Sequence, residues 1–281
     1  MQNNRIINAW CMYDWANSVY SLVITTAIFP IYYNAVTTSS SGSDIVSFFG
    51  IEIVNSVLYS YSLSFSFLIL TFFQPILSGI ADFSGNKKLF LRLFMYLGSF
   101  SCMALYFFDG DNIEFGIICS VVASIGFTGS LVFYNAFLPE IASARDFDRI
   151  SARGYTFGYI GSVILLIICL ILIQMFDSFG FKDSKSATKF TFLLVGVWWI
   201  IFSQITLWFL PQNVKKIKIN FEILSHGIRE LFKVWNYIKN VRNLRLYLFS
   251  YFFYSMGVQT IMLVASYFGS KELNLDQDKL I

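Results

Sequence analysis

Residues 13–33 read YDWANSVYSLVITTAIFPIYY, and this stretch decides the class of fold. It opens with Tyr13, Asp14 and Trp15 and then runs without a charge from Ala16 to Tyr33. A helix needs about 20 apolar residues to cross the hydrocarbon core of a bilayer. Trp and Tyr are enriched at both membrane interfaces, so the aromatic residues at the two ends fit this length. The stretch therefore predicts a membrane-spanning helix.

The same run contains four polar side chains, at Asn17, Ser18, Thr25 and Thr26. Lipid offers such groups no hydrogen-bond partner, whereas a buried helix face or a water-filled cavity does. The polar residues therefore indicate that this helix faces protein or a cavity over part of its length.

Composition places the whole chain in the membrane class. Of its 281 residues, 56% are hydrophobic and 13% are charged, and the mean hydropathy is +0.63. Soluble domains carry about 25% charged residues. No alternating strand pattern of the barrel type appears. We therefore expect an all-α polytopic membrane protein with the lipid bilayer as its main partner and no nucleic-acid partner.

Seven charge-free runs predict seven transmembrane helices, since each span must satisfy its own backbone in lipid. The runs are Ala16–Tyr33, Ile53–Ala81, Leu93–Phe108, Phe115–Pro139, Gly154–Phe176, Phe190–Val214 and Leu246–Ser270. The third run is the shortest. We expect its helix to include Leu89–Leu91, with Arg92 reaching back to the surface.

The distribution of Lys and Arg predicts the orientation. With the N-terminus in the cytoplasm, 15 of the 20 basic residues lie on the cytoplasmic side. The positive-inside rule favours this arrangement, although the loop 177–189 carries three lysines on the opposite side. The chain is thus predicted to be a multi-pass integral membrane protein, in the cell membrane if it is bacterial.

Three domains are expected: a six-helix half over 1–210, a cytoplasmic connector over 211–243, and a seventh helix with the start of a second half over 244–281. In the connector, apolar residues recur every three or four positions and basic residues lie between them, which predicts an amphipathic helix on the membrane surface. A partner-binding helix is the alternative. The apolar positions are Phe221, Leu224, Ile228, Leu231, Trp235 and Ile238.

No catalytic or metal-binding constellation is visible, so we expect no enzyme activity, no cofactor and no metal. The single histidine, His226, reads as a solvated surface residue, and the four cysteines read as packing residues. Charges gather instead at the predicted cytoplasmic helix ends, at Asp14, Asp82, Glu140 and Arg153. This pattern disfavours an ion pump built on a mid-membrane carboxylate and permits a neutral or zwitterionic solute.

Residues 74–88, QPILSGIADFSGNKK, join the second and third runs by a short turn. Gly85 permits a tight reversal, Asp82 can face a helix N-terminus or an arginine, and Lys87 and Lys88 hold the loop inside. An ordinary tight turn is the simpler interpretation, and a conformational latch is the one we favour.

Residues 133–140, FYNAFLPE, place Tyr134 and Asn135 at a helix end. Glu140 and Arg153 bracket the loop that follows and are candidates for an ion pair. Asn135 fits cavity lining and an interhelical hydrogen bond equally well. The glycines that follow the loop, at 154, 158 and 161, are spaced for close helix packing, which is the interpretation we favour for them.

The loop over residues 78–88 resembles the motif Gly-x-Leu-Ala-Asp-Arg-x-Gly-Arg-Lys of the major facilitator superfamily, matching it at Ala81, Asp82, Gly85 and Lys87. Three narrower motifs, YDWANS at 13–18, FYNAFLP at 133–139 and SARG at 151–154, resemble the branch that contains the autophagy-related vacuolar amino-acid effluxers and their bacterial relatives.

The resemblance implies two six-helix halves that alternate access around a central cavity, and a loop motif that stabilises one access state. If this chain follows the family's arrangement, five of its residues lie near the cavity: Asn17, Thr25, Tyr134, Asn135 and Gln259. Two features depart from the family. Residues 254–260, YSMGVQT, lack an acidic residue that the family tends to carry, and the chain stops at Ile281, after the seventh helix.

The sequence thus predicts the N-terminal half of a major-facilitator-type fold plus a seventh helix, with the C-terminal half missing. The function implied is secondary transport of small solutes, amino acids among them, by a truncated chain that needs its missing half or another chain for a complete cavity. A non-transporting membrane scaffold or receptor, or a gene remnant, is the alternative.

Overall fold

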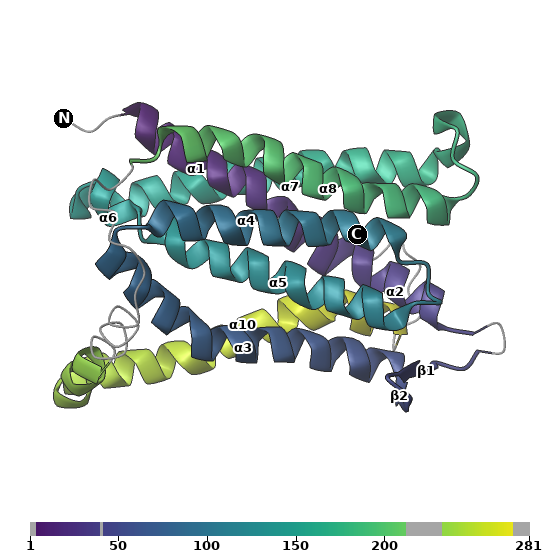
Figure 1. Cartoon of the computed structure of the whole chain (residues 1–281), viewed down its shortest axis with the longest axis horizontal. Coiled ribbons are helices and arrows are strands. Elements are labelled where there is room, and N and C mark those ends of the chain that lie inside the picture. The colour runs from purple at the N-terminus through teal and green to yellow at the C-terminus, as the bar shows by residue number, and fades with distance from the viewer. Residues whose placement is uncertain (1–3, 40–41, 212–231, 272–281) are drawn as a thin grey trace. The chain divides into compact units, whose positions relative to one another are not determined.

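The computed structural model describes residues 4–39, 42–211 and 232–271, and it is built almost wholly of helices (Figure 1). The all-α prediction is confirmed. The longer helices are α1 (Asn4–Val19), α2 (Phe29–Thr37), α3 (Asn55–Ser84), α4 (Lys87–Ala104), α5 (Ile113–Asn135), α7 (Phe147–Gln174), α8 (Ser184–Phe209) and α10 (Arg242–Lys271). The shorter ones are the π-helix η1 (Tyr20–Ile28), α6 (Leu138–Ile141), and the 3₁₀ turns η2 (Leu105–Phe107), η3 (Ala144–Asp146) and η4 (Phe176–Phe179).

Six helical segments among the described residues are long and apolar enough to cross a membrane, which confirms the first six predicted spans. They are Asn4–Thr37, Asn55–Ala81, Lys87–Phe107, Ile113–Ile141, Ala144–Gln174 and Ser184–Phe209. The third begins at Lys87, so it does include Leu89–Leu91. The seventh predicted run forms α10, whose crossing of the membrane stays a prediction.

The chain divides into two compact units, one formed by Met1–Leu70 with Lys88–Gln212 and the other by Thr71–Lys87 with Asn213–Ile281. The domain boundaries predicted at 210 and 243 stay predictions. Most of the predicted connector helix, with His226, lies outside the described residues. Residues 232–240 of that connector are helical, and Lys239 Nζ lies 5.5 Å from the centroid of the Trp235 ring.

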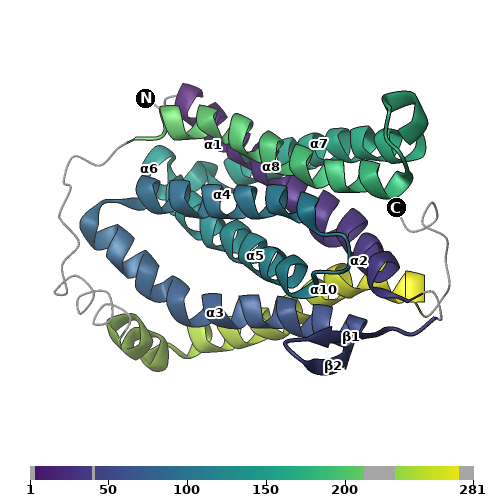
Figure 2. The same ribbon diagram turned by 45° about the vertical axis from the view of Figure 1, so that its right-hand side comes forward.

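Helix α1 forms the centre of the first unit, where it packs lengthwise against α7 and α8 (Figures 1 and 2). Two side chains of α8 donate hydrogen bonds to its backbone: Trp198 Nε1 to the carbonyl of Trp15 at 3.2 Å, and Thr206 Oγ1 to that of Ala9 at 2.6 Å. Trp10 and Trp199 are among the largest fully buried side chains. Helix α1 is therefore held by protein rather than by lipid.

Glycines allow the helices of this unit to approach closely. A Cβ atom on Gly126 of α5 would overlap the backbone of Gly98 of α4. On α7, a Cβ on Gly154, Gly158 or Gly161 would clash with Asp14, Ser18 or Trp15 of α1. The packing interpretation of these three glycines is confirmed, because each accommodates a side chain of α1.

A two-stranded antiparallel hairpin between α2 and α3 was not expected. Strand β1 (Ile45–Phe48) pairs with β2 (Ile51–Val54), with Ile45 opposite Val54. The turn residues Phe49 and Gly50 both have positive φ, of 49° and 81°. The Phe49 N–H donates to Glu114 Oε1 at 3.0 Å. Sequence reasoning missed the hairpin because Phe-Gly is not one of the usual dipeptides for such a turn.

The side chain of Asp183 caps the N-terminus of helix α8. Asp183 Oδ1 accepts a hydrogen bond from the Ser186 backbone N–H at 2.7 Å. Hydrogen bonds from Ser186 hold the pKa of this carboxyl below its usual value. The cap satisfies one of the free N–H groups at the start of the helix and places a negative charge at its positive end.

The contact between α4 and α5 can be tested with Gly126→Ala. The added methyl group would overlap the Gly98 backbone, which moves only if the helices separate, so the free energy of unfolding should fall by about 1–3 kcal/mol. Thermal unfolding in detergent measures the effect. Val163→Ile is the control, because it adds one carbon to a side chain of α7 that is 44% exposed. Equal midpoints for the two variants would contradict the close approach.

Candidate functional site

The candidate site begins with a buried carboxylate on the first helix. Asp14 of α1 is 7% exposed, and its Oδ2 accepts a hydrogen bond from the Tyr134 hydroxyl of α5 at 2.7 Å. A charge within a membrane-spanning segment is costly and usually marks function. The hydroxyl compensates part of that cost and joins two helices that lie 120 residues apart in sequence.

Aromatic rings enclose this hydrogen bond. The Trp10 ring stacks on Tyr134 with a centroid distance of 4.3 Å, and its Nε1 donates to the Tyr134 carbonyl at 3.0 Å. The Tyr13 ring lies 4.9 Å from the same tyrosine. Gly154 of α7 completes the enclosure, because any side chain there would overlap Asp14. Three helices thus fix the position of one carboxylate.

Beyond this pair the first helix widens into the π-helix η1. The Thr26 hydroxyl donates to the Ser21 carbonyl at 2.9 Å, and the Phe29 N–H donates to the Ile24 carbonyl, so both bonds span five residues. Pro30 follows and has no N–H to offer an upstream carbonyl. The Thr and Pro residues account for the wider turns, and π-helical segments occur frequently at functional sites.

Several buried polar atoms of this helix and of α8 have no hydrogen-bond partner in the described part of the chain. They include Asn17 Nδ2, Thr25 Oγ1, Trp199 Nε1 and Ser203 Oγ. Asn17 is 1% exposed and Thr25 is 8% exposed. A buried polar group without a partner costs about 1–3 kcal/mol. These atoms can hydrogen-bond to water or to a neutral or zwitterionic solute.

Trp199 and Ser203 were not among the residues predicted from sequence. Both lie inside the charge-free run of α8, where Trp reads as an apolar residue and Ser as a small packing residue. One signal was available, since Trp199 and Ser203 are four residues apart and so share one helix face. Burial on that face places them toward the interior of the first unit.

The predicted cavity residues occupy different environments. Asn17, Thr25 and Tyr134 are buried in the first unit, whereas Asn135 is exposed at the last position of α5. Gln259 is exposed on α10, in the second unit. Of these residues, Tyr134 contacts α1 through its hydrogen bond to Asp14. The roles of all five residues in a cavity stay predictions.

The predicted loop motif lies at the short connection between α3 and α4. Helix α3 ends at Ser84, Gly85 has a φ of 66°, and α4 begins at Lys87. Within the first unit, Lys88 Nζ donates to the Leu210 carbonyl at 2.9 Å, just after the end of α8. The backbone of Asp82 is in the last turn of α3, and its side chain lies outside the described residues. The latch stays a prediction.

The remaining predicted charges lie around the loop between α5 and α7. Glu140 is exposed on α6, and the Arg153 guanidinium of α7 lies 5.6 Å from the centroid of the Phe157 ring. In the same region Arg149 pairs with Asp146 at 2.8 Å, and the pairing of Glu140 with Arg153 stays a prediction. Across the described residues, no group of three His, Cys, Asp or Glu side chains is placed to hold a metal ion.

Comparison with known proteins finds relatives that are named as an MFS-type transporter and as autophagy-related protein 22. The chain is 34% identical over 276 residues to an uncharacterized MFS-type transporter, YxiO, of Bacillus subtilis (strain 168), covering 98% of this chain and 62% of the relative. It is 21% identical over 365 residues to autophagy-related protein 22 of Pyricularia oryzae, covering 98% and 53%. The chain thus spans about three fifths or less of the length of these relatives. No solved structure matches it.

A family model described as "Vacuole effluxer Atg22 like" matches residues 2–281, which is nearly the whole chain. The motifs that carry the resemblance lie at the structural centre of the first unit. YDWANS contributes Asp14 and Asn17, FYNAFLP contributes Tyr134, and SARG contributes Gly154. The chain belongs to the Atg22-like vacuole effluxer family of major-facilitator-type transporters.

Proposed function

We propose that the protein moves small solutes across a membrane by alternating access. The observation that carries the proposal is the set of unpartnered polar atoms buried on α1, η1 and α8. Such atoms are costly inside a membrane protein unless something binds them at some stage of its cycle. Membership of a transporter family supplies the class of activity.

The chemistry of these atoms favours a neutral or zwitterionic solute such as an amino acid. The amide of Asn17, the hydroxyls of Thr25 and Ser203 and the indole N–H of Trp199 are uncharged donors and acceptors. The nearby carboxylate of Asp14 is already bound by Tyr134. An anionic solute would face no compensating cation in this group.

Alternating access also requires a second helical half. In major-facilitator-type transporters two six-helix halves rock around a site near the bilayer midplane. The described residues include six candidate spans, and the relatives are longer than this chain. We propose that a second half, in a longer chain or another subunit, completes the cavity.

The proposed orientation places the N-terminus in the cytoplasm and can be measured directly. Lys182→Cys lies in the loop before α8, and Arg145→Cys lies in η3, at opposite ends of α7. An impermeant maleimide added outside intact cells should label position 182 and not position 145. The four native cysteines are buried, which keeps the background low. The reverse labelling would contradict the orientation.

Transport should depend on the bond between Tyr134 and Asp14. Removing the hydroxyl with Tyr134→Phe leaves a buried carboxylate without its donor, a loss of about 1–3 kcal/mol, or roughly fivefold to 150-fold in any equilibrium it controls. Uptake of labelled amino acids into vesicles, with protein taken from source membranes together with any second half, should fall accordingly. Tyr159→Phe is the matched control, because that ring is 66% exposed.

Two results would contradict, respectively, the proposed transport and the role of the bond between Tyr134 and Asp14. The first is a folded protein, judged by an unfolding midpoint close to that of the wild type, that moves no solute from a broad metabolite panel. The second is equal uptake by Tyr134→Phe and Tyr159→Phe when wild-type uptake is measurable. The first result would reject transport by the assembly tested, and the second would reject only the role of this bond.

A further inference from the structure

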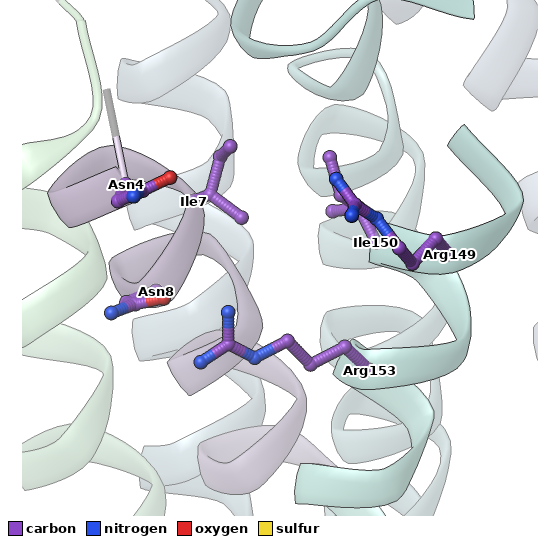
Figure 3. A pocket seen from close by; sticks show the side chains of 6 residues that line it. All are labelled: Asn4, Ile7, Asn8, Arg149, Ile150 and Arg153. Carbon is purple, nitrogen blue, oxygen red and sulfur yellow. The ribbon is translucent and has the colours of Figure 1, made fainter. Parts of the chain in front are cut away.

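A second polar site lies at the end of the first unit where α1 and α7 both begin. A cavity of about 450 Å³ opens there between the two helices (Figure 3). Its lining residues come from the first two turns of each helix. They are Asn4, Ile7 and Asn8 of α1, and Arg149, Ile150 and Arg153 of α7.

The arginines carry the charge of this cavity. Arg153 extends from α7 toward α1 (Figure 3), and it forms no ion pair with a carboxylate of the described residues. Arg149 bonds Asp146 through one terminal nitrogen at 2.8 Å, which leaves other N–H groups of its guanidinium available. Among the described residues, the Arg153 guanidinium therefore has no ion-pair partner, and the Arg149 guanidinium is only partly used by Asp146.

The rest of the lining divides by polarity. Asn4 and Asn8 are exposed, and each carries an amide NH₂ group that can donate two hydrogen bonds. Ile7 and Ile150 are buried, at 4% and 3% exposure, and form an apolar floor. Polar donors thus surround an apolar base, an arrangement that suits a ligand with an anionic head and an apolar continuation.

The helix ends add to the positive potential. Helices α1 and α7 begin at Asn4 and Phe147, so their N-terminal ends, which carry partial positive charge, lie beside the cavity. Asp146 is the one carboxylate paired with a lining residue among those described. The balance of charge around the cavity therefore favours an anion.

We propose that this cavity binds the phosphate group of an anionic ligand, either a phospholipid headgroup or a soluble phosphate ester. Guanidinium groups of α7 and amide groups of α1 both line the cavity. A tetrahedral phosphate presents oxygens in several directions and can use all of these donors, whereas a carboxylate presents two oxygens in one plane. The cavity lies at the end of two membrane-spanning helices, where lipid phosphates are concentrated, and Ile7 and Ile150 can contact the glycerol and first acyl carbons.

The test measures adducts of the detergent-solubilised full chain by native mass spectrometry. The probes are short-chain phosphatidic acid, short-chain phosphatidylcholine and glycerol 3-phosphate. Arg153→Gln should weaken phosphatidic acid binding by roughly tenfold or more, the size expected for losing a charged hydrogen bond. Asn8→Asp, which places a negative charge on the opposite wall, should weaken it as well. Arg145→Gln is the control, since it removes an equal charge from the adjacent loop outside the cavity.

The probes distinguish the two sources of phosphate. Phosphatidic acid binding that exceeds glycerol 3-phosphate binding at least tenfold identifies a lipid site, and equal binding of the two identifies a site for a soluble ester. The proposal is overturned if neither anionic probe binds the wild-type chain. It is also overturned if phosphatidylcholine binds as well as phosphatidic acid, or if Arg145→Gln loses as much binding as Arg153→Gln. Unfolding midpoints near that of the wild type exclude misfolding as the cause.

Discussion

The hydrogen bond from Tyr134 to Asp14 is the interaction on which the first unit depends. A carboxylate inside a membrane bundle needs a donor, and this one obtains it from a helix distant in sequence. That requirement brings α5 to α1, stacks Trp10 on Tyr134, and allows only glycine at position 154 of α7. One polar contact thus involves residues of all three motifs that carry the resemblance to the family.

The same helix shows how polar groups are divided between structure and function. The Asp14 carboxylate is satisfied by Tyr134, whereas Asn17 and Thr25 have buried atoms without hydrogen-bond partners in the described chain. The π-helix η1 lies between Asp14 and the far end of the span and includes Thr25. A site for a passing solute needs this combination, because groups that are already paired gain little from binding one.

Charge-free runs located the six spans from sequence because a lipid environment restricts the backbone to helices. The motif YDWANS indicated which helix carries polar side chains that need partners other than lipid. The spacing of Gly154, Gly158 and Gly161 indicated close packing of helices. Sequence alone could not pair Asp14 with Tyr134, because that contact depends on how the helices are arranged. It also could not reveal Trp199 and Ser203, whose residue types are ordinary in apolar runs, or the arginine-lined cavity, which two distant segments form together.

The central claim is that the unpartnered polar atoms of α1, η1 and α8 bind a solute, with Thr25 of η1 among them. Amide hydrogen exchange of the protein, with and without a saturating mixture of amino acids, tests it most directly. The account predicts slower exchange over residues 20–28 when the solutes are present, since bound solute would order the π-helical turns. Unchanged exchange in this segment, under conditions in which vesicles prepared from the same protein take up amino acids, would contradict it and place the solute elsewhere.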